Sequence, residues 1–168
     1  MPKLIRRGAV VDDARVVVRN AIAVADVPAG PVLVPLSLWT SARDALLARG
    51  NVGVWLAPTD DPATLADDTA RLPAIAVDFP AFTDGRGYST ARLLRERYGY
   101  TGELRAVGDI QRDQLAYLVQ AGFDAFALAE GRDPQAALAS LADFTDGYQH
   151  TGLRTPWFRR RAAAGAGA

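Results

Sequence analysis

The residues best suited to hold a ligand lie close together in this 168-residue chain, between positions 84 and 92. Two glycines there let backbone amides approach a ligand, and two arginines can hold an oxyanion through paired hydrogen bonds. A serine is predicted to cap a following helix, whose free N–H groups favour negative charge. The pattern predicts a pocket for a small oxyanion such as sulfite, sulfate or phosphate, formed by Asp84, Gly85, Arg86, Gly87, Tyr88, Ser89 and Arg92.

The same segment has a simpler interpretation. Gly85-Arg86-Gly87 can be no more than a turn before a helix, because isolated glycine motifs are weak evidence of a binding site. Arg86 would then be solvated or paired with Asp84. The sequence leaves both interpretations open.

Two carboxylates, Asp78 and Asp109, end the third and fourth of five predicted strands. Neighbouring strands lie about 5 Å apart, so these side chains can share one mouth of a sheet and act as an acid–base pair. Arg112 follows in sequence and could hold an anionic substrate. The alternative is structural: Asp109 caps a helix that runs to Gln120, and Asp78 pairs with Arg105 or Arg112.

Composition excludes several kinds of site. Without cysteine the chain has no disulfide, no thiolate nucleophile and no cysteine ligand for zinc, siroheme or an iron–sulfur cluster. His150 is the single histidine, so we expect no metal site, and the cofactor stays unknown. Neither GxGxxG nor GxxxxGK[ST] occurs. Nineteen basic and nineteen acidic residues cancel, so we expect no nucleic-acid or membrane partner.

The elements that must position these residues follow from five short apolar runs, at 31–36, 52–57, 74–77, 104–107 and 125–128. Each is bounded by Gly, Pro or Asp, which is typical of buried parallel strands. Helical patterns lie between them. Asp61-Pro62 and Asp133-Pro134 predict helix starts, Gly50, Gly99 and Gly122 predict helix ends, and a helix is predicted over 89–98.

Alternating strands and helices predict an α/β fold with a mainly parallel sheet, either open or an incomplete TIM-like barrel. Residues 3–20 predict two or three short strands that form an N-terminal hairpin. We therefore expect one domain over 1–148, with the repeats in 31–148. A flexible tail is predicted over 149–168, with a basic aromatic run at 157–161 followed by Ala and Gly.

Two expectations concern the setting of the protein. The N-terminus lacks the apolar core of a signal peptide, and no run of 18 apolar residues occurs, so a cytoplasmic location is expected. A partial barrel must pair or close, so a homo-oligomer is expected. Four tyrosines are predicted to pack with their hydroxyls reaching solvent: Tyr88, Tyr98, Tyr100 and Tyr117.

The central part of the chain resembles an uncharacterised bacterial family, domain of unknown function 934. The resemblance covers about residues 3–148 and rests on 78–89 (DFPAFTDGRGYS), 91–95 (ARLLR), 98–109 (YGYTGELRAVGD), 112–114 (RDQ) and 122–126 (GFDAF). Members of this family are named as oxidoreductases involved in sulfite reduction, and their genes tend to lie beside those of sulfite reductase.

The resemblance implies a role in assimilatory sulfur metabolism. We expect an accessory protein that binds a reductase partner, or a small sulfur oxyanion at the loop after the third strand. One alternative is an oxidoreductase with a borrowed flavin or nicotinamide cofactor, in which Arg86, Arg92 and Arg112 hold the substrate and Asp78 and Asp109 move protons. Another is a degenerate barrel whose role is structural and oligomeric.

Overall fold

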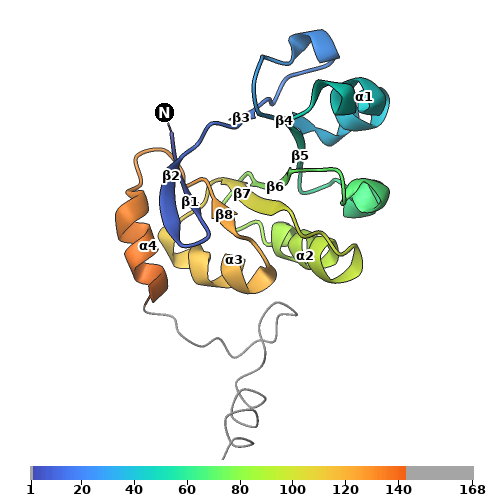
Figure 1. Cartoon of the computed structure of the whole chain (residues 1–168). Helices are drawn as coiled ribbons and strands as arrows, with labels where there is room; N and C mark the ends of the chain where they lie inside the picture. Colours follow the sequence, from blue (N-terminus) through green and yellow to red (C-terminus); the bar gives the residue numbers. More distant parts are fainter. Residues whose placement is uncertain (1, 143–168) are drawn as a thin grey trace, which may run out of the picture.

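One eight-stranded sheet organises residues 2–142, the part of the chain that the computed structural model describes (Figure 1). The strand order is β2-β1-β8-β7-β6-β5-β4-β3. Strands β3 to β8 run parallel, and the N-terminal hairpin adds two antiparallel strands beside β8. The strands are β1 (Lys3–Arg6), β2 (Ala9–Asp12), β3 (Val16–Val17), β4 (Val32–Pro35), β5 (Val52–Leu56), β6 (Ala74–Phe79), β7 (Glu103–Gly108) and β8 (Ala125–Phe126).

The helices cover one face of this sheet, which Figure 1 shows as an arc of strands with the helices outside it. Strands β3 to β8 are neighbours in chain order, so right-handed crossovers bring every connection to the same side. The connections hold η1 (Val24–Asp26), α1 (Leu36–Arg49), η2 (Pro62–Asp68), α2 (Arg86–Arg92) continued by the π-helical η3 (Leu93–Arg97), η4 (Arg112–Gln114), α3 (Leu115–Ala121) and α4 (Pro134–Ala142).

The sheet curls because its two edges are joined by a short link. Strand β2 ends at Asp12 and β3, on the opposite edge, begins at Val16. Four residue steps span at most about 14 Å, whereas the edges of a flat eight-stranded sheet would lie about 33 Å apart. The outcome is an open half-barrel, so the predicted α/β class with a mainly parallel sheet is confirmed.

Side chains alternate between the two faces of the curled sheet. On the convex face the strands contribute residues such as Val54, Ile75 and Leu104 to the main core under the helices. On the concave face a smaller cluster forms around Leu33, Ala76 and other residues from the neighbouring strands. Successive side chains of these strands point to opposite faces, and both faces are buried. This is why the runs in the sequence are apolar without interruption.

Ion pairs fill the polar part of the concave face. Arg105, 2% exposed, donates to both carboxylate oxygens of Asp13 at 2.9 and 2.8 Å and to Glu103 at 2.8 and 3.1 Å. Arg19 holds Asp78 with two bonds of 3.1 and 2.8 Å. Residues 13 and 19 flank β3, so these pairs tie one edge of the sheet to its centre. Asp78 therefore pairs with Arg19, and the predicted pairing with Arg105 or Arg112 is wrong.

Local signals in the sequence predict several element boundaries. The side chain of Asp61 accepts a bond from the Ala63 amide and Asp133 from the Gln135 amide, which confirms both Asp-Pro starts, although the first leads into a 3-10 helix. Gly50 and Gly122 end α1 and α3 as predicted. The expected helix over 89–98 begins earlier, at Arg86, and turns π-helical after residue 92.

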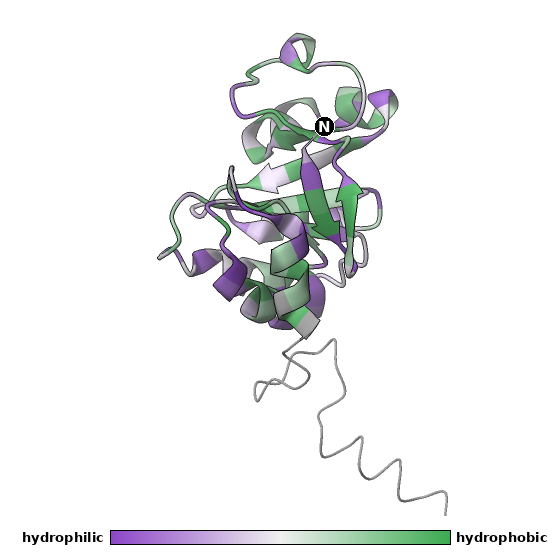
Figure 2. Cartoon of the chain, turned by 90° about the vertical axis from the view of Figure 1, so that its left-hand side faces the viewer, coloured by the Kyte–Doolittle hydropathy of each residue, from purple (hydrophilic) through white to green (hydrophobic). Residues whose placement is uncertain are grey.

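The N-terminal region differs from the expected single hairpin. The hairpin consists of β1 and β2, joined by Arg7 and Gly8, both with positive φ (49° and 81°). β3 leaves it and pairs with β4 instead. Helix α4 packs on β1 and β2 and carries both hydrophobic and hydrophilic residues, as Figure 2 shows from that side.

Two further expectations concern the membrane and the C-terminal tail. No helix within residues 2–142 is long and apolar enough to cross a bilayer. The predicted tail, with its basic aromatic run at 157–161, lies outside the described residues.

Candidate functional site

The loop between β6 and α2 carries the charged pair that the sequence singled out. Arg86 donates from Nε and Nη2 to the two Asp84 carboxylate oxygens at 2.9 and 2.6 Å, and its amide donates to Asp84 at 3.2 Å. The Arg86 bonds hold the pKa of Asp84 below its usual value, and the Asp84 bond raises the pKa of Arg86. The Arg86 side chain is 59% exposed, so this loop holds a surface ion pair whose cation is already engaged.

The two glycines of this loop have different roles. Gly85 is the N-cap of α2 and has open space where a side chain would begin. Gly87 lies under Phe79, and a Cβ there would come within 2.4 Å of the ring. Phe79 is fully buried and packs edge-on against Tyr88 and Phe123, so Gly87 lets α2 approach the sheet closely.

The predicted capping roles of Ser89 and Asp109 are wrong. Ser89 lies inside α2, which begins three residues earlier, so its hydroxyl is not at the helix N-terminus. Asp109 caps no helix and accepts a bond of 3.1 Å from the amide of Phe82. Gln114 donates to the Phe82 carbonyl oxygen at 3.2 Å. The two bonds tie the loop before α2 to the loop before α3.

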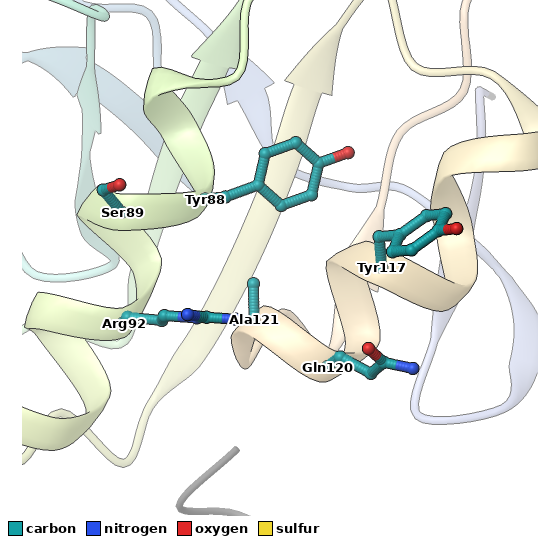
Figure 3. A pocket seen from close by; sticks show the side chains of 6 residues that line it. All are labelled: Tyr88, Ser89, Arg92, Tyr117, Gln120 and Ala121. Carbon is teal, nitrogen blue, oxygen red and sulfur yellow. The ribbon is translucent and has the colours of Figure 1, made fainter. Parts of the chain in front are cut away.

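A cavity of about 360 Å³ opens between α2 and α3. Tyr88 and Arg92 are four residues apart on α2 and extend towards α3, while Tyr117, Gln120 and Ala121 line it from α3; Ser89 completes the lining (Figure 3). Residues three and four apart share one face of a helix, so Tyr88 and Arg92 form a short polar stripe on α2, and Tyr117 and Gln120 lie on one face of α3. Hence three residues of the predicted oxyanion site, Tyr88, Ser89 and Arg92, do line one cavity.

The lining of this cavity suits an anion. Arg92 is the one charged group among its six lining residues, and the other polar groups are hydroxyls and an amide, all able to donate hydrogen bonds. Within residues 2–142 no hydrogen bond or ion pair engages the Arg92 side chain. Burial raises the pKa of Tyr88, and the nearby Tyr117 adds to this against a hydrogen bond with Gln114, so Tyr88 stays a donor at neutral pH.

The three predicted catalytic residues have separate partners. Asp78 is held by Arg19, Asp109 by the Phe82 amide, and Arg112 lies 3.5 Å from Asp113. Arg112 lines a second cavity of about 250 Å³, at the carboxyl ends of β7 and β8, with Arg132, Asp113 and Asp133. Positive and negative side chains are balanced there, in contrast to the cavity between α2 and α3. Among residues 2–142, no group of three or more acidic or histidine side chains is placed to hold a metal ion.

Sequence reasoning missed the half of the cavity that belongs to α3. Tyr117 was expected only to pack, and Gln120 and Ala121 carried no signal. Their i, i+3, i+4 spacing matches the Tyr88–Arg92 spacing on α2, but that match has meaning only once the two helices are known to be neighbours. Tyr100, also expected to reach solvent, is buried instead and donates to the carbonyl oxygens of Leu72 and Glu103.

These features define an α/β half-barrel with a donor-lined cavity on its helical side. Residues 53–158 match the family model described as a bacterial protein of unknown function (DUF934), and the chain belongs to this family. The match spans β5 to α4 and so includes both helices of the cavity. It confirms the family resemblance, although it begins later than residue 3. No curated protein matches the chain.

Proposed function

We propose that this protein binds a small sulfur oxyanion, sulfite or sulfate, in the cavity between α2 and α3, as an accessory protein of assimilatory sulfite reduction. The observation that carries the proposal is Arg92, a guanidinium without a carboxylate partner in residues 2–142, set among neutral donors. An oxyanion gains charge-assisted hydrogen bonds from such a group without having to displace an existing partner.

The partners of Arg86 explain why we place the proposed site in the cavity between α2 and α3 and not in the loop before α2. An anion that binds Arg86 has to compete with two short bonds from Asp84 and is repelled by that carboxylate. An anion at Arg92 meets neither cost. The neighbouring hydroxyls of Tyr88 and Ser89 and the amide of Gln120 offer further donors.

The ties between the two loops support a preformed site. Asp109 accepts a hydrogen bond from the backbone N–H of Phe82, and Gln114 donates one to the backbone carbonyl oxygen of Phe82. These contacts fix the start of α2 against the start of α3, so the cavity needs little rearrangement to receive a ligand. Preorganisation of this kind lowers the entropic cost of binding.

Isothermal titration calorimetry with sodium sulfite and sodium sulfate at low ionic strength tests the proposal. The wild-type protein should bind one of these anions, and Arg92→Gln should weaken that binding at least about tenfold, since a hydrogen bond to a charged group is worth about 1.5–3 kcal/mol. The matched control is Arg86→Gln, an exposed arginine six residues away, which should change the affinity by less than about twofold.

Three outcomes contradict the proposal in different ways. Loss of binding in Arg86→Gln with Arg92→Gln unchanged would return the site to the loop after β6. No binding of either anion by the wild-type protein would remove the oxyanion function. Consumption of NADPH that depends on both sulfite and the protein would favour the oxidoreductase alternative.

A further inference from the structure

We propose that the cavity between α2 and α3 also binds an aromatic molecule that carries a sulfate or phosphate monoester, and binds it more tightly than the free oxyanion. The inference rests on the proposed function, because the same Arg92 would receive the anionic group. It adds the class of molecule to which that group is attached.

The first argument is the size of the cavity. Its volume of about 360 Å³ lies within the range of about 300–1,000 Å³ that small-molecule pockets occupy. A sulfate ion has five heavy atoms, and at about 30 Å³ for each water-sized atom it would fill less than half of this space. A free oxyanion would therefore leave most of the lining in contact with water.

The second argument is the distribution of groups along the lining. Two phenol rings line the cavity, Tyr88 from α2 and Tyr117 from α3; Tyr88 extends towards α3, and Arg92 lies one helical turn further along α2 (Figure 3). Tyr117 is 63% exposed and is one of five exposed large hydrophobic residues within residues 2–142. A planar ring placed against these phenols would gain stacking or edge contacts.

The third argument is charge. The lining has no carboxylate, so nothing in it would neutralise a cationic aromatic ligand, and Arg92 would repel one. A neutral aromatic ligand would leave Arg92 without a counter-ion. In a ligand that joins a ring to an anionic ester, the ring can contact the phenols while the ester group pairs with Arg92. Mononucleotides and aryl esters share this chemistry.

The test is a titration of the full chain with four probes: phenyl sulfate, adenosine 5′-monophosphate, inorganic sulfate and phenol. We expect the better of the two esters to bind about tenfold or more tightly than inorganic sulfate, and phenol to bind too weakly to measure. The ester preferred distinguishes a nucleotide source from an aryl-ester source, and either preference supports the shared chemistry.

Variants separate the two ends of the cavity. Tyr117→Ala should weaken binding of the preferred ester about tenfold more than it weakens binding of inorganic sulfate, while Tyr117→Phe, which keeps the ring, should retain ester binding. Arg92→Gln should weaken both the ester and sulfate. Circular dichroism and urea unfolding of each variant show whether it is folded, and Tyr117 is exposed enough for its replacement to be tolerated.

The outcomes distinguish this inference from the function on which it rests. Equal affinity for sulfate and both esters, unchanged in Tyr117→Ala, would overturn the aromatic ligand and leave oxyanion binding intact. Binding of phenol as tight as that of phenyl sulfate would also overturn it, because the anionic group would then contribute nothing. Failure of all four probes, together with failure of sulfite to bind, would remove both the aromatic ligand and the oxyanion function.

Discussion

On the concave face of the half-barrel, Arg105 is buried between Asp13 and Glu103, and Arg19 is held by Asp78. On the convex side, Arg92 extends into a cavity with no carboxylate in its lining. A buried guanidinium has lost its hydration, and charged partners must compensate for that loss. A guanidinium at a surface cavity keeps some of its water and is stable without a partner until a ligand binds. The comparison separates arginines that hold the fold together from an arginine that lines a cavity and has no ion-pair partner within residues 2–142.

The sharpest test of the concave face is Arg105→Ala. Removing the cation leaves the largely buried carboxylate of Asp13 without its ion pair and that of Glu103 with only the 3.5 Å contact to Arg6, so the free energy of unfolding should fall by about 3–5 kcal/mol. Urea unfolding followed by circular dichroism measures the loss. A change below about 1 kcal/mol would show that water can replace the ion pairs of the concave face at little cost in stability.

The approach of α2 to the sheet is tested by Gly87→Ala. The added methyl group meets the buried ring of Phe79, so we expect a loss of about 1–3 kcal/mol in the free energy of unfolding and weaker oxyanion binding. Gly85→Ala is the matched control, with open space at the same distance from Arg86. If both variants unfold at the same urea concentration, the close contact with Phe79 does not set the position of α2.

The stability of the protein at alkaline pH tests the burial of the Tyr100 side chain. Burial raises the pKa of this phenol well above its usual value of about 10. The folded protein therefore keeps the proton while the unfolded chain loses it, and stability should fall as the pH rises above about 10. Tyr100→Phe should cost about 1 kcal/mol at neutral pH and show a shallower alkaline decline. An identical alkaline loss of stability in the wild-type protein and the variant would show that titratable groups other than Tyr100 cause it.

The smallest effect is expected from Arg92→Gln on the protein without ligand. Arg92 has no partner within residues 2–142, so its replacement should change the free energy of unfolding by less than about 0.5 kcal/mol. The anion should then raise the thermal unfolding midpoint of the wild-type protein but not that of the variant. A large loss of stability without ligand would place Arg92 with the structural arginines.

The strands and most helix ends could be predicted because their signals are local. The run at Ala74–Val77 is apolar at every position, which marks a strand buried on both faces. The Asp133 cap lies two residues from the amide that it receives. By contrast, Ser89 has the chemistry of a cap, but α2 starts at Arg86 because Gly87 allows contact with Phe79. Burial of that contact outweighed the local preference.

The sequence by itself determined the α/β class, the alternation of strands and helices, and the family to which the chain belongs. These depend on patterns within a few residues. Only the tertiary structure decided that Asp78 pairs with Arg19, 59 positions away, and that the Tyr88–Arg92 stripe lines one cavity with Tyr117 and Gln120. Such contacts depend on the curl of the whole sheet and on which helices become neighbours, and no short stretch of residues encodes either.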